Sequence, residues 1–365
     1  MSFRSRRLLA AMLGVAMIAA ACSADGGVAP SAGATTAASP DGSASVSAAP
    51  SQGNVEPTKL VVGLGYIPSV QFAQFYLADQ AGYYRDAGLE VEFQNKIDPD
   101  LITLVGQGSI DVGLADGTSV IPAASQGIPI RYLATVYGKF PSIVFGKASA
   151  GIATAADLKG KKLGIPGRYG SSWIMLQALL ASANLSPDDL QIVEYPDFGQ
   201  GAAVAAGAVD VATGFANNEP VQLELAGTPV TVLTIDDVTP LPGPGIIAGQ
   251  ATIEAKPEAL RAFVQATVRA MQEITADPEV GLQAAITAVP ELATQREAQA
   301  AILDATIAAW TAPVQTANGL GALDRDGWVA SIAYLKTLQG AGGVPLVPNP
   351  ITVDEVLADG FVPAR

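Results

Sequence analysis

An internal repeat with an offset of about 100 residues is the feature that most constrains the fold of this chain. Segment 108–112 (GSIDV) matches 207–211 (GAVDV), and 127–130 (GIPI) matches 227–230 (GTPV). Both matches occur in the same order along the chain. Because stacked solenoid repeats have periods of about 20–50 residues, a period this long indicates two copies of a domain-sized unit.

Within the first copy, apolar strands alternate with helical segments. Strands are predicted at 59–65, 90–93, 111–114 and 130–136, and helices at 70–81, 98–106 and 119–126. The strand that contains Gly164 corresponds in the second copy to the first strand, which ends near Gly63. Such alternation favours parallel sheets. We therefore predict the α/β class, with two lobes that each contain a mostly parallel sheet flanked by helices, and a hinge between them.

The repeat also sets the expected domain organisation. We predict a lobe I, a lobe II and a return to lobe I with C-terminal helices, at 58–148, 149–240 and 241–365. The two connections between the lobes, near 137–150 and 235–250, are expected to act as the hinge. In a fold of this class, ligands bind outside the carboxyl ends of the parallel strands. Two facing lobes would therefore enclose one cleft.

Residues 1–21 have the pattern of a signal peptide. Three arginines precede an apolar run over 8–21, which is too short to span a bilayer comfortably. Three alanines, beginning at Ala19, then precede Cys22. This resembles a bacterial lipobox, in which the cysteine is lipidated on its sulfur and becomes the mature N-terminus, although Ala19 stands where leucine is commoner.

The segment 22–57 predicts a flexible tether. It is rich in Ser, Ala, Gly, Thr and Pro and has almost no aliphatic periodicity. Together with Cys22, it predicts a soluble body that is lipid-anchored at the extracytoplasmic face of the cell membrane. The alternative is a plain secretory signal that an accidental cysteine follows.

Composition excludes several classes of function. The chain has 34 acidic and 20 basic residues, so nucleic acid is not an expected partner. It contains no histidine and a single cysteine, so a disulfide within the chain is impossible. Zinc, haem and iron–sulfur sites lack their usual ligands. We expect no catalytic residue, no metal and no cofactor.

Four segments in order resemble the solute-binding proteins of ABC importers. They are 81–91 (AGYYRDAGLEV), 106–113 (GQGSIDVG), 126–130 (QGIPI) and 157–164 (DLKGKKLG). The nearest group takes up taurine, nitrate and thiamine pyrimidine precursors, and the resemblance covers roughly 58–275. It implies a type II-like periplasmic-binding-protein fold that closes on its ligand, without enzymatic activity. It also implies permease and ATPase partners and a monomeric state.

A finer resemblance concerns the ligand. Residues 167–173 (GRYGSSW) and 217–220 (NNEP) look like the branch that binds pyrimidine or flavin compounds, and are similar to the riboflavin-binding subunits of riboflavin importers. This implies capture of riboflavin or a closely related flavin. A thiamine pyrimidine precursor is the alternative. Sulfonates or nitrate would require more basic residues than Arg168. Pyrimidine synthases of similar fold depend on His and Cys clusters, which this chain lacks. A further alternative is a sensor that presents its closed form to a receptor kinase.

The candidate ligand-binding residues lie on loops that follow strands. Aromatic side chains there can stack on a planar ring, and polar side chains can hydrogen-bond its edge. The predicted ring contacts are Tyr66, Tyr137, Tyr169 and Trp173. The predicted polar contacts are Asp116, Thr118, Arg168, Asn217, Asn218 and Glu219, with Gly170, Ser171 and Ser172 as donors at a helix N-terminus.

Simpler interpretations stay open for several of these residues. The two asparagines suit a turn, Glu219 suits the first turn of a helix, and Arg168 suits a solvated turn. Asp111 and Asp210 recur at matching places ahead of strands, and we interpret both as structural.

Overall fold

The computed structural model describes residues 56–97, 100–236, 238–340 and 343–363. The predicted signal peptide, Cys22 and nearly all of the predicted tether lie outside the described residues. Among the helices of the described part, none combines the length and the apolar composition that a membrane crossing requires.

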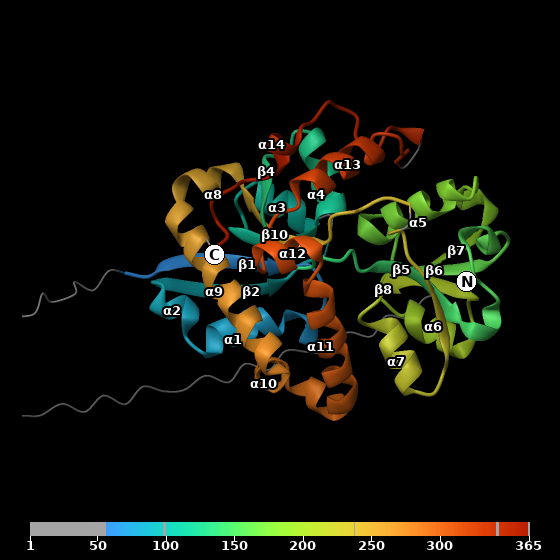
Figure 1. Cartoon of the computed structure of the whole chain (residues 1–365), viewed down its shortest axis with the longest axis horizontal. Coiled ribbons are helices and arrows are strands. Elements are labelled where there is room, and N and C mark those ends of the chain that lie inside the picture. The colour runs from blue at the N-terminus through green and yellow to red at the C-terminus, as the bar shows by residue number, and fades with distance from the viewer. Residues whose placement is uncertain (1–55, 98–99, 237, 341–342, 364–365) are drawn as a thin grey trace, which may run out of the picture. The chain divides into compact units, whose positions relative to one another are not determined.

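Two five-stranded sheets organise the chain (Figure 1). The first has the order β2-β1-β3-β10-β4, formed by Leu89–Asn95, Thr58–Leu64, Val112–Asp116, Pro244–Gly249 and Ile130–Thr135. The second has the order β7-β6-β8-β5-β9, formed by Gln191–Glu194, Lys162–Ile165, Val211–Phe215, Ser142–Lys147 and Val230–Leu233. In each sheet a single strand, β10 or β5, runs antiparallel to its two neighbours.

The equal strand orders explain the internal repeat. Strands β1 to β4 occupy the same places in the first sheet as β6 to β9 occupy in the second. The prediction of two mostly parallel sheets is therefore confirmed. Strand β5, however, falls inside the segment 58–148 predicted as lobe I, yet it belongs to the second sheet. The chain first crosses between the sheets after β4, because an apolar strand does not reveal from its own pattern which sheet it joins.

Helices pack on both sheets. In the first lobe these are η1 and α1 to α4, at Val70–Phe72, Ala73–Gln80, Tyr83–Asp86, Asp100–Gly106 and Gly117–Ser125. In the second they are η2, η3, α5, η4, α6 and α7, at Ala148–Ala150, Ala155–Leu158, Gly170–Ser182, Pro187–Asp189, Gln200–Ala206 and Glu219–Leu225. Helices α3 and α4 cover the first sheet, and α5, α6 and α7 contact the second.

The C-terminal helices pack mainly on the first lobe. They are α8, α9, α10, η5, α11, α12, α13 and α14, at Gln250–Ala255, Pro257–Ala276, Pro278–Ala288, Pro290–Gln295, Arg296–Trp310, Pro313–Asn318, Arg325–Leu335 and Val353–Val356. Helix α1 packs against α9 and α10, and the rings of Tyr84 and Phe263 stack with centroids 4.9 Å apart. Helix α11 also contacts α7 of the second lobe.

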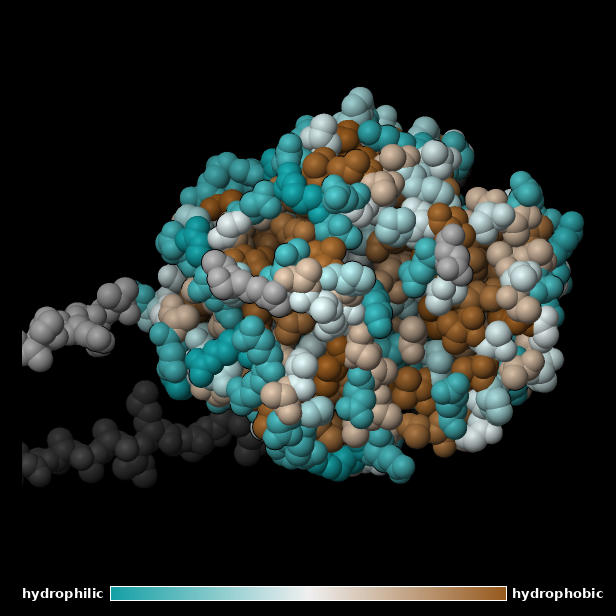
Figure 2. Space-filling view, in the orientation of Figure 1, coloured by the Kyte–Doolittle hydropathy of each residue, from teal (hydrophilic) through white to brown (hydrophobic). Residues whose placement is uncertain are grey.

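Hydrophilic and hydrophobic residues mix on the face drawn in Figure 2. Large hydrophobic side chains that are exposed, such as Ile67, Leu225 and Val329, come from separate elements. Scattered exposure of this kind is normal for a folded protein and indicates no interface by itself.

Asp111 and Asp210 make the same backbone contact in the two lobes. Asp111 accepts a hydrogen bond from Val61 N at 2.9 Å, and its own N–H donates to Val61 O. Asp210 accepts from Lys162 N at 2.8 Å and donates its N–H to Lys162 O. Each carboxylate thus accepts a backbone hydrogen bond from the neighbouring strand, just before its own strand begins. This agrees with a structural interpretation of the pair.

We predict that Asp111→Ala lowers the free energy of unfolding by about 1–3 kcal/mol. The reason is that the change removes the acceptor for Val61 N–H and leaves Lys256, 2.7 Å away, without its carboxylate. Urea unfolding followed by circular dichroism measures the loss. The control is Asp86→Ala on the surface, where about ±0.5 kcal/mol is expected. Equal losses in the two variants would contradict the assigned role.

Candidate functional site

A cavity lies where strands of both sheets end. Its wall includes Tyr66 after β1, Asp116 at the end of β3, Tyr169 after β6 and Glu219 after β8. Loops that follow strands of both sheets therefore meet at one site. The cavity volume of about 130 Å³ is roughly tenfold what a single buried water needs, so the space suits a ligand of many atoms.

Aromatic rings from both lobes line this cavity. The first lobe contributes Tyr66, Phe72 and Tyr137, and the second contributes Tyr169, Phe198 and Phe215. Tyr66 and Phe198 meet edge to face with ring centroids 4.9 Å apart. Such a wall can hold a flat, largely apolar ligand by ring contacts on more than one side.

Phe198 has an unusual backbone. Its φ of 60° lies in the left-handed region, which a bulky non-glycine residue rarely adopts. The residue precedes α6, and its ring lies against Tyr66 of the other lobe. Backbone strain of this kind persists where the surroundings fix it, often at ligand sites.

The polar groups of the wall are mainly acceptors and neutral donors. Asp116 and Glu219 supply carboxyl groups, and Gln71, Gln200 and Asn218 supply amides. None of the described residues that line the cavity is Lys or Arg. The electrostatics of this wall therefore disfavour a small anion.

The α5 N-terminus lies at the wall as well. Gly170, Ser171 and Ser172 all line the cavity, and α5 begins at Gly170. Gly170 has φ of 64°, which an L side chain adopts only with strain, so glycine fits the sharp turn there. The first N–H groups of a helix have no partner within it and can donate to a ligand.

Burial dominates the chemistry of Glu219. It raises the pKa of this carboxyl to about 7, and hydrogen bonds from the backbone N–H groups of Phe215 and Glu219 offset the shift only in part. Glu219 Oε2 accepts from Phe215 N at 2.9 Å, and Oε1 accepts from Gln200 Nε2 at 3.3 Å. Burial also raises the pKa of Tyr66, and the negative charge of Glu219 adds to that shift. Glu219 therefore changes charge near neutral pH.

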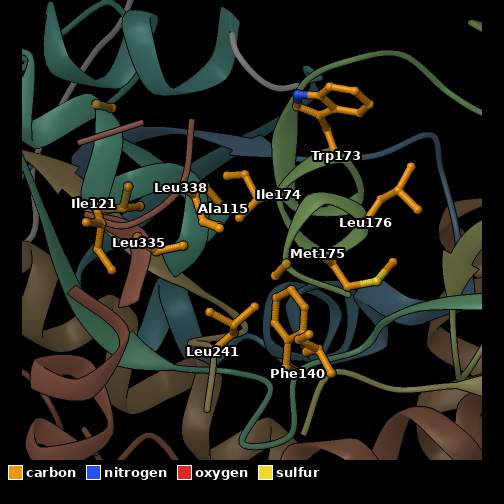
Figure 3. Close-up of a cluster of buried hydrophobic side chains, with 14 of the residues drawn as sticks. Ala115, Ile121, Phe140, Trp173, Ile174, Met175, Leu176, Leu241, Leu335 and Leu338 are labelled. Atoms are coloured by element: carbon orange, nitrogen blue, oxygen red, sulfur yellow. The ribbon is translucent and has the colours of Figure 1, made fainter. Parts of the chain in front are cut away.

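Trp173 is not in the cavity, contrary to the prediction that it stacks on a ligand there. It is 8% exposed and belongs to a hydrophobic cluster that joins α5 to the first lobe and the C-terminal segment. Figure 3 shows its ring on the side of α5 away from Phe140 and Leu241. Since successive helical residues are about 100° apart, Ser171 and Trp173 cannot face the same side.

Arg168 lies outside the cavity wall too. Its guanidinium group is 5.4 Å from the centre of the Trp173 ring and pairs with Glu194, with Nε and Oε1 3.3 Å apart. Both residues of this ion pair are half exposed. The side chain is thus a surface turn residue rather than part of the cavity.

Thr118 and Asn217, which correspond in the repeat, are both buried away from the cavity wall. Thr118 is the second residue of α4 and is fully buried. Asn217 comes from the loop between β8 and α7 and is 2% exposed. Its Nδ2 lies 2.9 Å from Gln71 Oε1 and 2.8 Å from Thr306 Oγ1, both in the first lobe. Asn217 therefore joins the lobes.

Five aromatic or amide side chains of the cavity wall are not among the predicted contacts: Gln71, Phe72, Phe198, Gln200 and Phe215. Phe198 and Gln200 follow β7, a strand that was not predicted, so the loop after it was not considered. Gln71 and Phe72 belong to a single turn of 3-10 helix before α1 and resembled core positions of a longer helix. Predicting β7 would have placed the loop 195–200 at the cleft.

Comparison with known proteins agrees with this architecture. The profile of the NMT1/THI5 like family matches residues 69–280. The chain is 32% identical to the riboflavin-binding protein RibY of Chloroflexus aurantiacus over 98% of each protein. It is 26% identical to the 4-amino-5-hydroxymethyl-2-methylpyrimidine phosphate synthase of Legionella pneumophila, over 60% of this chain and 70% of that one.

Among solved structures, the fold resembles the alkanesulfonate-binding protein SsuA of Xanthomonas axonopodis bound to MOPS. The TM-score is 0.65 at 20% identity, over 84% of this chain and 99% of that one. The expected two-lobed periplasmic-binding-protein fold is thereby confirmed.

The raised pKa of Glu219 predicts a pH-dependent stability. The pKa of a glutamate is about 4.3 in an unfolded chain, whereas that of Glu219 is about 7 in the folded protein. Deprotonation of Glu219 therefore lowers the free energy of unfolding as the pH rises between these two values. Glu219→Gln removes this titration. The melting temperature of the variant minus that of the wild type should therefore be larger at pH 8 than at pH 5. Equal differences at the two pH values would show that Glu219 does not titrate in this range.

Proposed function

Because this chain belongs to the NMT1/THI5-like family, we propose that it is the substrate-binding lipoprotein of an ABC importer and that it captures riboflavin or a closely related flavin. It then delivers the ligand to the permease and ATPase subunits. The observation that carries the proposal is the 32% identity to a riboflavin-binding protein over 98% of both chains. The lipobox-like sequence that ends at Cys22 and the segment after it support a lipid anchor at the extracytoplasmic face, and we propose that the protein is a monomer there.

The cavity wall supports a flavin as ligand. Six aromatic rings, three from each lobe, offer faces to a flat heterocycle. The buried amides of Gln71 and Gln200 and the carboxyl group of Glu219 can hydrogen-bond its polar edge. A site of this kind buries most of its ligand and orients it by a few polar groups.

Capture follows from the division of the wall between two lobes. A ligand that contacts Tyr66 of the first lobe and Phe198 of the second favours the closed arrangement over the open one. The Asn217 contacts with Gln71 and Thr306 form only when the lobes are together. The connections after β4 and after β9 act as the hinge.

Binding without chemical change fits the residues present. The chain has no histidine, and its single cysteine lies in the N-terminal segment. Pyrimidine synthesis is the activity in the name of the Legionella relative, which is less similar over a smaller share of the chain.

A thiamine pyrimidine precursor is the second candidate. The 26% identity to a pyrimidine phosphate synthase favours it, and Glu219 could bind an aminopyrimidine edge. Sulfonates and nitrate fit less well, since the described cavity wall carries carboxyl groups and no basic side chain.

The proposal predicts that the purified full-length chain in detergent quenches riboflavin fluorescence with a saturable one-to-one titration. Stacking on the cavity rings is the physical reason. Thermal unfolding with and without an aminopyrimidine tests the second candidate in the same preparation. If the protein did not bind riboflavin but was stabilised by the aminopyrimidine, the second candidate ligand would replace the first.

Ring contacts predict a contrast between two aromatic positions. Phe198→Ala should weaken riboflavin binding by about 10- to 100-fold, since a lost stacking partner costs roughly 1–3 kcal/mol. Trp173→Ala should change affinity by less than about threefold while lowering the free energy of unfolding by roughly 3–5 kcal/mol. Calorimetric titration and urea unfolding measure the two effects. If the folded Trp173→Ala variant lost much of its affinity for riboflavin, Trp173 would have to be a ligand contact.

A further inference from the structure

We propose that two buried glutamines, whose amides are held by hydrogen bonds within the protein, recognise the polar edge of the ligand. Gln71 of the first lobe presents an N–H donor, Gln200 of the second presents a carbonyl acceptor, and Asn217 is the positioning residue for Gln71. The identity of the probe rests on the proposed function. The orientation of the amides rests on contacts within the protein.

Gln200 has its nitrogen occupied and its oxygen free. The residue is 1% exposed, lines the cavity and is the first residue of α6. Its Nε2 donates to Glu219 Oε1 at 3.3 Å, whereas Oε1 has no hydrogen-bond partner among the described residues. A buried carbonyl without a donor destabilises the site that contains it. A ligand N–H at this position would pair with it.

Gln71 has the opposite arrangement. It is 5% exposed and also lines the cavity. Its Oε1 accepts from Asn217 Nδ2 at 2.9 Å, and one Nε2 proton is donated to Ser69 Oγ at 3.1 Å. An amide nitrogen carries two protons, so the second remains for a ligand acceptor.

A chain of hydrogen bonds fixes the direction of the Gln71 amide. The carbonyl oxygen of Ile302 can only accept, so the Thr306 hydroxyl donates to it at 2.7 Å. Thr306 Oγ1 then accepts from Asn217 Nδ2 at 2.8 Å. The amide nitrogen of Asn217 must therefore face the first lobe, where it also reaches Gln71 Oε1. A backbone carbonyl of α11 thus decides which atom of Gln71 is available to the cavity.

The resulting pattern selects a class of ligand. The matching ligand has a neutral ring edge on which a carbonyl group lies beside an N–H group. The carbonyl would accept from Gln71 of the first lobe, and the N–H would donate to Gln200 of the second. The pyrimidine-dione ring of a flavin has such an edge. A ligand that lacks the N–H would leave Gln200 Oε1 unpaired, and sites of this kind reject such analogues strongly.

The acceptor role of Gln200 is tested with riboflavin and 3-methylriboflavin, in which a methyl group replaces the ring N–H proton. The wild-type full-length chain should prefer riboflavin by at least tenfold. Gln200→Met, of similar volume, should reduce this preference at least fivefold by weakening riboflavin binding. The matched control is Gln74→Met, a fully buried glutamine of α1 outside the cavity, which should keep the wild-type preference.

Equal affinity of the wild type for the two flavins, or an unchanged preference in a folded Gln200→Met variant, overturns the assignment and leaves the proposed function intact. A wild-type chain that binds neither flavin overturns the proposed function and this assignment together. The first comparison needs no variant, so a failure of Gln200→Met to fold does not prevent the test.

The positioning role of Asn217 is tested by non-additivity. Gln71→Met should weaken riboflavin binding about tenfold in the wild-type background. In an Asn217→Asp background, the carboxylate draws the Gln71 nitrogen toward itself and turns its oxygen away, so adding Gln71→Met should change affinity less than twofold. Losses that multiply would show that Asn217 acts on lobe closure alone and would overturn its positioning role.

Discussion

The exchange of one antiparallel strand between two parallel sheets is the constraint on which the structure depends. Strand β5 enters the second sheet before the four strands of that lobe, and β10 returns to the first sheet after them. The chain therefore crosses between the lobes twice, and both sheets acquire the same strand order. Because β1, β3, β6 and β8 are parallel within their sheets, their carboxyl ends gather at one edge of each lobe. The cavity exists because these two edges face each other.

The lobes contact each other through the apolar cluster that contains Trp173 and through a few buried polar and aromatic pairs. Asn217 inserts from the second lobe among Gln71 and Thr306, and Tyr66 meets Phe198 across the cavity. A buried amide is favourable only when its donors are paired, so opening must replace these contacts with water. The same contacts orient groups of the cavity wall. In the proposed mechanism, lobe closure and ligand recognition therefore share the same side chains.

The candidate site divides into residues that local pattern could find and residues that it could not. Tyr66, Asp116, Tyr169 and Glu219 follow strands that the repeat identifies, and all line the cavity. Trp173 lies only four residues beyond Tyr169 but faces a core cluster, because the rotation of α5 separates the two directions. Phe198 and Gln200 were missed because the short strand β7, of four residues, has a weak pattern.

The two-lobed α/β class follows from the sequence alone, because a repeat about 100 residues long and alternating strands and helices are local and periodic patterns. The sequence also determines which chemistry is absent, since a chain without histidine cannot use one. The tertiary structure decides that β5 joins the second sheet, that Asn217 contacts the first lobe, and that Gln200 lines the cavity with an oxygen that has no partner among the described residues. These facts depend on partners that lie far apart along the chain, such as Asn217 and Thr306, and the local pattern of a sequence does not contain such distances.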